Sequence, residues 1–412
     1  MLDIKFIRDH QKEVEKNNST RNVKVDLNEI LELDGERNEL QKKADALRAQ
    51  RNRGSKTKPS DEEIALMKKI GEEISGLEEL ANDKEELLKN KLLSIPNINH
   101  ETTPVGKDES GNVVERKVGE APVFNFQPKE HFEVANIKPL IDMERGAKVS
   151  GSRFYYLKGK LAILERAIMQ FAIDTMIKKG FELILPPLLV KEAAMFGTGF
   201  FPADKNEIYA VNPDEDNLYL VGTSEVPLIY MHADEALEAK DLPKKYVAVT
   251  PCFRRESGSY GKDTRGLIRV HQFYKVEVVV FAPPEVSWKM HEEILSYEEE
   301  VLRALGLHYQ VVNICSGDLG FPAAKKYDCE AWFPGQERYR ELTSASNTTD
   351  YQARRSNIKY KNAEGKRELL HTLNGTITSD RPLLAVIENY QQEDGSVTIP
   401  EVLQKYTGFD RI

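Results

Sequence analysis

The sequence predicts an α+β protein in which a long antiparallel pair of helices precedes a domain with a largely antiparallel sheet. Two patterns along the 412 residues indicate this fold. Residues 26–95 carry apolar side chains at the heptad spacing of a narrow coiled-coil stripe. Further along, short β-rich runs mix irregularly with amphipathic helices, without the repeated strand–helix unit of a parallel Rossmann sheet.

The helical pair is predicted from an apolar seam on either side of one break. In the first helix successive apolar residues are seven, four and three positions apart, and Arg37 occupies the seam position within the seven-residue step. In the second helix the steps are three, four and seven. The seam residues are Leu33, Leu40, Ala44 and Leu47, then Met67, Ile70, Ile74, Leu77, Ala81 and Leu88. The break is GSKTKPS (54–60), where Ser60 as N-cap and Glu63 form a capping box. A short turn makes the helices antiparallel, and the arm is on the order of 45 Å long.

A net charge of −9 argues against a nucleic-acid partner for the chain as a whole. The turn end of the helical pair is an exception, because basic residues gather there without an acid among them. A basic end on a projecting rod indicates contact with the backbone of a polyanion, with a solvated helical tip as the alternative. The candidate residues are Arg48, Arg51, Arg53, Lys56 and Lys58.

A polar linker, residues 96–112, follows the helical pair, and we expect domains at 1–105 and 106–412. The composition, 40% hydrophobic and 30% charged, is typical of a soluble protein. No apolar run approaches the roughly 20 residues of a membrane span, and the N-terminus lacks the apolar core of a signal peptide. The three cysteines form no CxxC pair or Cys/His cluster, so we expect free thiols, no zinc site and a cytoplasmic location.

In the second domain we expect strands at 183–185, 218–221, 246–250, 267–280, 308–312 and 371–373, and helices at 161–179, 286–305 and 382–390.

Residues 250–277, TPCFRRESGSYGKDTRGLIRVHQFYKVE, are the most informative part of the chain. Two strand-like runs, 246–253 and 267–280, flank a Gly-, Ser- and Asp-rich loop, which predicts a long hairpin. Guanidinium groups there can bind phosphate, an aromatic ring can stack on a base, and carboxylates can meet an amine or hydroxyl. A site for a nucleotide and a small substrate is therefore predicted around Arg254, Glu256, Arg269, Phe273 and Glu277. Without a GxGxxG or Walker A motif, side chains must hold the nucleotide.

The order of these residues resembles the second signature motif of class II aminoacyl-tRNA synthetases, in the form used by seryl-tRNA synthetases. The matching pattern is F-R-x-E, then G-S-x-G-x-D-T-R-G-L-I-R-x-H-Q-F, then K-V-E. Similar blocks are IDMERGAKVSGSRFYYLKG (141–159), FGTGFFP (196–202), VGTSEVPL (221–228), YRELTSASNTTDYQARR (339–355) and HTLNGTITSDRPLLAVIENYQ (371–391). The resemblance covers essentially the whole chain and implies an antiparallel-sheet class II catalytic domain behind a coiled-coil arm.

The resemblance implies a serine–tRNA ligase, which forms seryl-adenylate from serine and ATP and passes serine to the 3′ end of tRNA(Ser), and by the same resemblance of tRNA(Sec). The attacking carboxylate is ionised at neutral pH, so no general base is needed, and the eight histidines show no triad or metal spacing. The enzyme must instead orient two anions and neutralise charge at phosphorus with Arg and Mg²⁺.

By resemblance, three motifs hold the nucleotide. Arg254 binds the α-phosphate and the serine carboxylate, Glu256 takes the adenine amino group and Phe273 stacks on adenine. Arg269 reaches phosphate, and the backbone at Val270 contacts the nucleotide. The whole implied ATP set is Arg254, Arg255, Glu256, Arg269, Val270, Phe273, Glu341, Leu342, Thr343, Ser344 and Arg381.

The resemblance also assigns the metal and the third motif. Glu341 and Ser344 hold Mg²⁺ and phosphate, and Arg381 covers the other face of adenine and the γ-phosphate. The implied catalytic residues are Arg254, Glu341 and Arg381. Asp380 directly precedes Arg381 and is a candidate cap for the following helix, with Pro382 in its first turn.

The implied serine pocket is polar, because a hydroxymethyl group is too small to be distinguished by apolar packing. We expect Glu277 to bind the serine hydroxyl. The full set is Thr223, Glu225, Arg254, Glu277, Asn374 and Thr376.

One further expectation follows from the resemblance. Pro187 in GFELILPPLLV is similar to the proline of the first class II motif and implies a homodimer, although a plain strand-ending proline is the alternative.

Another class II synthetase, for threonine or proline, would be favoured by a zinc cluster or an anticodon-binding domain, and the sequence has neither. A non-catalytic paralogue that uses its rod for binding would have lost Arg254, Glu277 or Glu341, which are all present.

Overall fold

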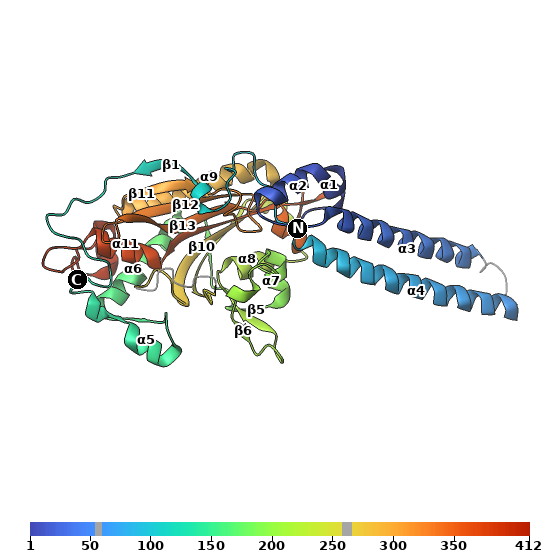
Figure 1. The fold of residues 1–412 in the computed structure, drawn as a ribbon, viewed down its shortest axis with the longest axis horizontal. Coiled ribbons are helices and arrows are strands. Elements are labelled where there is room, and N and C mark those ends of the chain that lie inside the picture. Colours follow the sequence, from blue (N-terminus) through green and yellow to red (C-terminus); the bar gives the residue numbers. More distant parts are fainter. Residues whose placement is uncertain (54–59, 258–265) are drawn as a thin grey trace. The chain divides into compact units, whose positions relative to one another are not determined.

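The computed structural model describes residues 1–53, 60–257 and 266–412. The chain separates into two compact units, Met1–Ile98 and Asn99–Ile412 (Figure 1). Lys56, Lys58 and the middle of the 250–277 loop lie outside the described residues. Within the described ranges, no helix is both long and apolar enough to cross a membrane.

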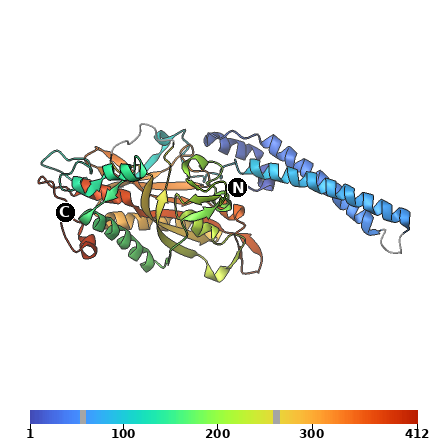
Figure 2. The same ribbon diagram turned by 90° about the horizontal axis from the view of Figure 1, so that it is seen from below.

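The first unit is helical, as the heptad pattern predicts. Its helices are α1 (Ile4–Asp9), α2 (Gln11–Thr20), α3 (Leu27–Arg53) and α4 (Asp61–Leu92). Helices α3 and α4 lie side by side in both views (Figures 1 and 2). The expected seam lies between them, and its buried members are Leu33, Ala44, Ile70, Ile74, Ala81 and Leu88.

Polar contacts fix the ends and the register of this arm. Ser60 Oγ accepts from the Glu63 amide at 3.2 Å, and Glu63 Oε2 accepts from the Ser60 amide at 2.7 Å, which confirms the capping box. Arg37 interrupts the apolar seam and joins the helices, because it donates to Asp34 of α3 at 2.8 Å and to Glu85 of α4 at 2.5 Å.

The second unit is built on an eight-stranded sheet, in which neighbouring strands are antiparallel except for the parallel pair at one edge, β9 and β4. The order is β1 (Val113–Val118), β11 (Tyr309–Asn313), β12 (Lys325–Phe333), β13 (Arg338–Asn347), β16 (His371–Ser379), β10 (Gln272–Ala282), β9 (Lys244–Phe253) and β4 (Glu182–Ile184). The predicted α+β class with a largely antiparallel sheet is confirmed.

Helices and small sheets surround this large sheet. The α-helices are α5 (Met143–Ser150), α6 (Gly159–Lys178), α7 (Glu192–Thr198), α8 (Glu225–Tyr230), α9 (Pro284–Ala304), α10 (Tyr351–Arg355), α11 (Asp380–Asn389) and α12 (Glu401–Thr407). The 3₁₀ turns are η2 (Glu109–Gly111), η3 (Lys138–Leu140), η4 (Lys205–Glu207) and η5 (Ala239–Asp241). The small sheets are β15 (Arg367–Leu369), β14 (Lys359–Lys361) and β8 (Ala236–Glu238); β2 (Ile141–Asp142) and β3 (Tyr156–Leu157); and β5 (Leu189–Lys191), β7 (Leu218–Leu220) and β6 (Ala210–Val211).

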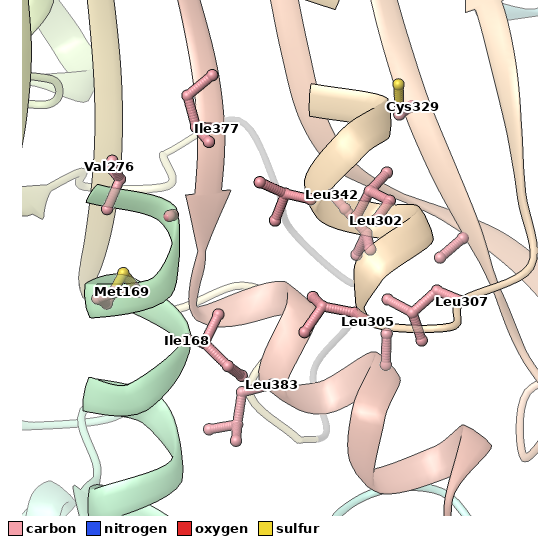
Figure 3. Close-up of a cluster of buried hydrophobic side chains, with 14 of the residues drawn as sticks. Ile168, Met169, Val276, Leu302, Leu305, Leu307, Cys329, Leu342, Ile377 and Leu383 are labelled. Carbon is pink, nitrogen blue, oxygen red and sulfur yellow. The ribbon is translucent and has the colours of Figure 1, made fainter. Parts of the chain in front are cut away.

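The main hydrophobic core lies between the large sheet and helices α6, α9 and α11 (Figure 3). Ile168 of α6, Leu302 of α9 and Leu383 of α11 are buried there. On β10, Val276 and Val278 point into this core, because side chains alternate between the two faces of a strand. The opposite face of the same strand is therefore available for a site.

One strand begins later than its sequence suggests. The run 267–280 predicts a continuous strand, but β10 begins at Gln272, and Leu267 and Ile268 lie in a turn before it. Both side chains are buried in the main core. Burial in a turn and burial in a strand produce the same apolar signal, so the pattern alone placed the strand start too early.

Candidate active site

A cavity of about 320 Å³ lies on the face of β10, β13 and β16 that carries polar side chains. It collects the residues that sequence analysis expected for serine and ATP, with the exception of Arg255. These lining residues are Thr223, Glu225, Arg254, Glu256, Arg269, Val270, Phe273, Glu277, Glu341, Leu342, Thr343, Ser344, Asn374, Thr376 and Arg381. Arg255 is exposed and does not line the cavity, although its amide is bonded to the Glu207 carbonyl.

Strand register explains why distant residues meet in this cavity. Phe273, Lys275 and Glu277 occupy every second position of β10 and share the cavity face. Glu277 is paired with Thr376 of β16 in the antiparallel ladder, so the second and third motifs become neighbours. A register irregularity next to Glu277 adjusts the local alignment of the two strands.

One end of the cavity is a buried ionic cluster. Glu277 is 1% exposed, accepts a hydrogen bond from Thr376 Oγ1 at 3.0 Å and forms an ion pair with Lys275. Lys275 is also buried, at 7% exposure. Lys275 was not among the residues expected from the sequence, although its position two residues before Glu277 in a strand indicates the same face.

Glu225, at the start of α8, is the second buried carboxylate at this end. Its Oε1 accepts from Gln352 Nε2 at 2.7 Å and from Asn374 Nδ2 at 3.0 Å. Burial raises the pKa of Glu225 to about 7, and repulsion from Glu277 adds to the effect, while the Gln352 hydrogen bond and Lys275 oppose it. The cavity thus presents two buried carboxylates at this end, Glu225 and Glu277.

At the other end, guanidinium groups and an aromatic ring meet. The Arg254 guanidinium lies over the Phe273 ring, 5.3 Å from its centroid, and Nε donates to the Gly222 carbonyl at 3.3 Å. Arg269 Nη1 donates to Glu256 Oε2 at 3.2 Å. Cationic groups beside an aromatic face suit a nucleotide, whose phosphates and base need these two kinds of contact.

Glu341 of β13 and Arg381 of α11 form a charged pair on the cavity wall. Arg381 Nη1 donates to Glu341 Oε2 at 3.0 Å and to the Glu341 carbonyl at 2.9 Å. Burial raises the pKa of Glu341, but the charges of Arg381 and Lys326 overcome this effect and bring it to about 2. Glu341 is therefore an anion at all physiological pH values.

Lys326 of β12 extends this charged wall, and its partner Asp328 lies behind it; neither was expected from the sequence. Lys326 Nζ lies 3.0 Å from Asp328 Oδ2. Burial lowers the pKa of Lys326, but the carboxylates of Asp328 and Glu341 raise it overall. Burial also raises the pKa of Asp328, to about 7, and the charge of Lys326 opposes the rise. The alternation of Lys326 and Asp328 in a strand was the available signal.

Asp380 does not cap α11, which corrects the sequence interpretation. The N-cap is Ser379, whose Oγ accepts from the Arg381 amide at 3.3 Å. The Asp380 carboxylate accepts from the Tyr274 amide at 2.9 Å and from the Tyr155 hydroxyl. Burial raises the pKa of Asp380 to about 6. These partners come from segments distant in sequence, so local pattern could not reveal them.

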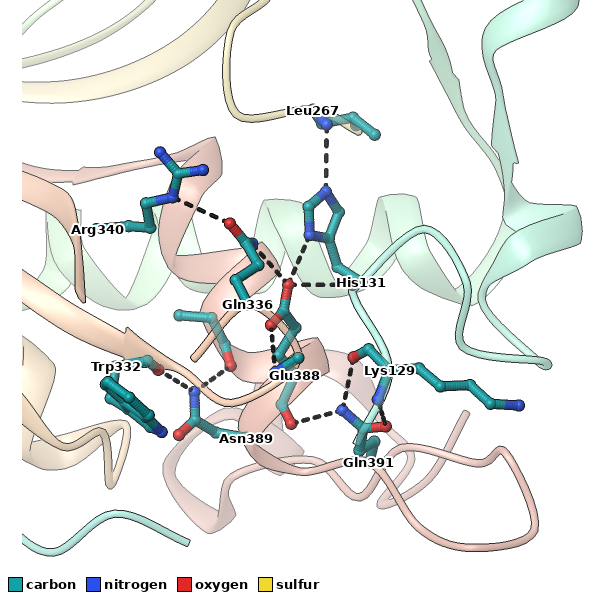
Figure 4. A network of polar contacts seen from close by, with 11 residues as sticks. Lys129, His131, Leu267, Trp332, Gln336, Arg340, Glu388, Asn389 and Gln391 are labelled. Carbon is teal, nitrogen blue, oxygen red and sulfur yellow. Dashed lines mark hydrogen bonds and ion pairs between the residues drawn. The ribbon is translucent and has the colours of Figure 1, made fainter. Parts of the chain in front are cut away.

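A buried polar network anchors the segment that enters the cavity from the hairpin loop (Figure 4). His131 Nδ1 lies 2.8 Å from Glu388 Oε1, and its Nε2 accepts from the Leu267 amide at 3.2 Å. Glu388 also accepts from Gln336 Nε2 at 3.0 Å and from the Gly335 amide at 3.0 Å. Leu267 precedes Arg269, Val270 and Phe273, so the network ties the nucleotide-side residues to helix α11.

The basic tip of the arm is only partly described. Arg48 is held by Asp45 at 2.7 Å and by Glu78 of α4, so its charge is largely compensated. Arg51 is exposed. Arg53 is the last residue of α3, and Lys56 and Lys58 lie outside the described residues.

Metal ligation by protein groups alone has no support in the described part of the chain, where no three His, Cys, Asp or Glu side chains converge on a point. Glu341 and Ser344 nevertheless provide oxygen atoms on the cavity wall. One or two such ligands, completed by substrate phosphates, are a common arrangement for Mg²⁺.

Comparison with known proteins places both units. Residues 1–99 match the family model described as the seryl-tRNA synthetase N-terminal domain, and residues 209–390 match the tRNA synthetase class II core domain for G, H, P, S and T. The chain is 45% identical to a serine–tRNA ligase of Thermodesulfovibrio yellowstonii, over 100% of both sequences. It is 43% identical to one of Rubrobacter xylanophilus, over 99% of this chain and 98% of the relative.

Solved structures agree with these matches. The seryl-tRNA synthetase of Pyrococcus horikoshii complexed with ATP has a TM-score of 0.93 at 42% identity, over 100% of this chain and 99% of the other. The cytoplasmic serine–tRNA ligase of Naegleria fowleri with AMP has a TM-score of 0.90 at 35% identity, over 100% and 98%. A prolyl-tRNA synthetase of Giardia lamblia, at 17% identity and a TM-score of 0.59, shares the fold alone. From its end-to-end likeness in sequence and structure, the chain belongs to the seryl-tRNA synthetase family.

Proposed function

We propose that the chain ligates serine to tRNA, and that the cavity on β10, β13 and β16 forms the seryl-adenylate. The observation that supports this best is the division of one cavity into two ends. Arg254 over Phe273 suits a nucleotide, and the buried group of Lys275, Glu277 and Thr376 suits a small polar substrate. Likeness to serine–tRNA ligases along the whole chain agrees with this assignment.

The reaction needs positioning and charge more than proton transfer. An oxygen of the serine carboxylate attacks the α-phosphorus and forms a new O–P bond. The bond from the α-phosphorus to the oxygen that bridges it to the β-phosphorus breaks, and pyrophosphate is released. Arg254 can grip the α-phosphate and the attacking carboxylate, because its planar group donates in two directions. The described residues that line the cavity include no histidine, as a reaction without a general base allows.

Serine is proposed to bind with its hydroxyl at Glu277. Thr376 and Lys275 already bond this carboxylate and fix its orientation. An alanine substrate would lack the hydroxyl that donates to this buried carboxylate, and the loss of that hydrogen bond is costly. The serine ammonium is proposed to lie beside Glu225, where its positive charge would favour the ionised form of that carboxyl.

Glu341 and Ser344 are proposed to hold Mg²⁺ together with the phosphates. The metal would supply positive charge to the phosphate oxygens during displacement. Arg381, which is bonded to Glu341, is then placed to contact the same phosphates.

The Met1–Ile98 unit is proposed to bind tRNA(Ser), and by family resemblance tRNA(Sec), through the arm. Its exposed Arg51 and the basic residues near the turn would contact the RNA backbone. Deleting residues 37–85 removes both Arg37 and its partner Glu85 and keeps the apolar base of the unit. Serine-dependent pyrophosphate exchange should survive this deletion, while aminoacylation should fall sharply. Normal charging by the deleted form would refute the role of the arm.

A point substitution at the tip gives a finer test. Arg51→Gln should flatten the slope of log K against log salt by about 0.7–0.9 if one phosphate contact is lost. Arg48→Gln is the matched control and should have a smaller effect, because Arg48 already pairs with Asp45 and Glu78.

A homodimer is proposed from an apolar surface next to Pro187. Large hydrophobic side chains are exposed on α6 and along the segment after it, namely Ile163, Ile177, Leu183, Leu185 and Leu189. Leu185 is 79% exposed, and several exposed large hydrophobic side chains within one stretch of chain are typical of a protein interface. Leu185→Asp should lower the mass measured by light scattering to that of a monomer, whereas Val123→Asp, at a valine that is 94% exposed, should leave it unchanged. The buried free thiols of all three cysteines agree with a cytoplasmic location.

The decisive experiment is ATP–pyrophosphate exchange with each of the twenty amino acids, followed by charging of tRNA(Ser) and tRNA(Sec) transcripts. We expect strong exchange with serine alone and charging that depends on the arm. Exchange with threonine or proline in preference to serine would refute the proposed substrate, and absence of exchange with any amino acid would refute the proposed activity.

A further inference from the structure

Gln352 of α10 is a fully buried glutamine behind the serine end of the cavity. It is not among the residues that line the cavity. Yet its amide bonds directly to Glu225, which does line it. The side chain therefore connects the substrate end of the site to the protein behind it.

Each polar atom of this amide has a hydrogen-bond partner. Nε2 donates to Glu225 Oε1 at 2.7 Å and to the Thr198 carbonyl at 2.9 Å. Oε1 accepts from Thr372 Oγ1 at 2.7 Å, and Thr348 Oγ1 lies 3.1 Å from it, with the Thr372 carbonyl as its other acceptor at 2.8 Å. Both N–H donors of the glutamine amide are thus used, and its oxygen is bonded. The reversed amide would place its oxygen against the Thr198 carbonyl, which cannot donate, so only one orientation fits.

This arrangement selects one oxygen of Glu225. Oε1 receives Gln352 and also Asn374 Nδ2 at 3.0 Å. Among the described residues, no side chain donates a hydrogen bond to Glu225 Oε2. The carboxylate is thus held through Oε1, and Oε2 is left for the substrate. Because Oε1 also accepts from Asn374, it fixes this second residue of the cavity wall.

We propose that Gln352 is a positioning residue for amino-acid recognition, which orients Glu225 and Asn374 toward the serine ammonium. It acts through these two side chains and does not touch the substrate. Thr348 and Thr372 lock its amide from the other side, and α10 carries it rigidly against β16. This inference rests on the proposed use of the cavity for serine.

The test compares Gln352→Met with a matched control. Gln310→Met breaks the same kind of bond, because Gln310 Nε2 donates to Glu330 Oε2 at 2.7 Å on strands β11 and β12. Neither of those residues lines the cavity. Both variants are assayed by serine-dependent pyrophosphate exchange, with KM measured separately for serine and ATP, and by thermal unfolding.

We expect Gln352→Met to raise the serine KM by about 10- to 100-fold, the loss typical of a hydrogen bond to a charged group. The ATP KM should change by less than about twofold, because Gln352 bonds to Glu225 at the serine end of the cavity and not to the nucleotide end. Gln310→Met should leave both KM values unchanged. Gln352→Glu should weaken serine binding further than Gln352→Met, because it sets a second carboxylate against Glu225 and supplies no N–H donor.

If Gln352→Met does not fold, Thr372→Val decides the matter, since it removes one lock on the amide with little change of volume. It should raise the serine KM in the same direction by a smaller factor. An unchanged serine KM in a folded Gln352 variant, or serine and ATP KM values that rise together as the melting temperature falls, would overturn the proposal. Absence of serine-dependent exchange in the native chain would instead refute the proposed function.

Discussion

Removing the Glu277 carboxylate should damage both serine recognition and folding, and the structure allows the two effects to be separated. Glu277 is 1% exposed and is bonded to Thr376 and Lys275. In Glu277→Ala, the serine hydroxyl loses its proposed acceptor, and Lys275 becomes a buried cation without this partner. The first effect concerns the substrate complex, and the second concerns the folded protein without substrate.

Each effect has an expected size. Loss of a buried hydrogen bond to a charged group should lower kcat/KM for serine by about 2 kcal/mol or more, or roughly 30-fold. Breaking a buried ion pair from one side should cost about 3–5 kcal/mol of unfolding free energy. The double variant Lys275→Met with Glu277→Ala removes the stranded charge, so it should regain much of that stability without regaining serine recognition.

Urea unfolding and pyrophosphate exchange, with serine and ATP varied in turn, measure these quantities on the same preparations. The KM for ATP should change little in Glu277→Ala. Unchanged serine kinetics in this variant would refute the assigned role. Recovery of normal serine kinetics in the double variant would show that Glu277 serves only to neutralise Lys275.

Three further predictions concern other parts of the site. Arg254→Lys keeps the charge but loses the two-pronged contact, so exchange should fall at least ~100-fold, and near-normal exchange in a folded variant would mean that another residue grips the α-phosphate. The pKa of Glu225 is raised from 4.5 to about 7, so its neutral form stabilises the fold below pH 4.5 and this contribution is lost as the pH rises through about 7. Relative to Glu225→Gln, the native protein should therefore lose about 3 kcal/mol of unfolding free energy across that interval, and a pH-independent difference in urea unfolding would contradict this. His131→Leu should raise the ATP KM more than the serine KM, because the Leu267 amide loses its acceptor, and should cost about 1–3 kcal/mol of stability; equal changes in the two KM values would argue against the anchoring role.

Much of the fold could be predicted from the sequence, because its strongest signals are local and periodic. The heptad steps and the Ser60–Glu63 capping box require only neighbours in the chain, and both are found as expected. The start of β10 was misplaced, because Leu267 is held in a turn by His131, more than a hundred residues away in the chain. No local pattern encodes such a contact.

The candidate site shows the same limit. The expected serine and ATP residues, apart from Arg255, come together in one cavity, while their individual roles stay predictions. Lys275 could have been inferred from strand alternation with Glu277. Gln352 could not, because its partners come from three separate segments and it carries no charge. Asp380 was assigned to a cap because the sequence shows its position and not its burial.

The two-faced character of β10 has a consequence for how such an enzyme can change over time. Val276 and Val278 support the scaffold, whereas Lys275 and Glu277 face the substrate end. Substitutions at Lys275 and Glu277 leave the packing of the valines untouched, but the two charges must change together, because each is buried against the other. A new amino-acid preference can thus be explored by paired substitution of Lys275 and Glu277, which makes this strand a natural starting point for redesigning the substrate range of the enzyme.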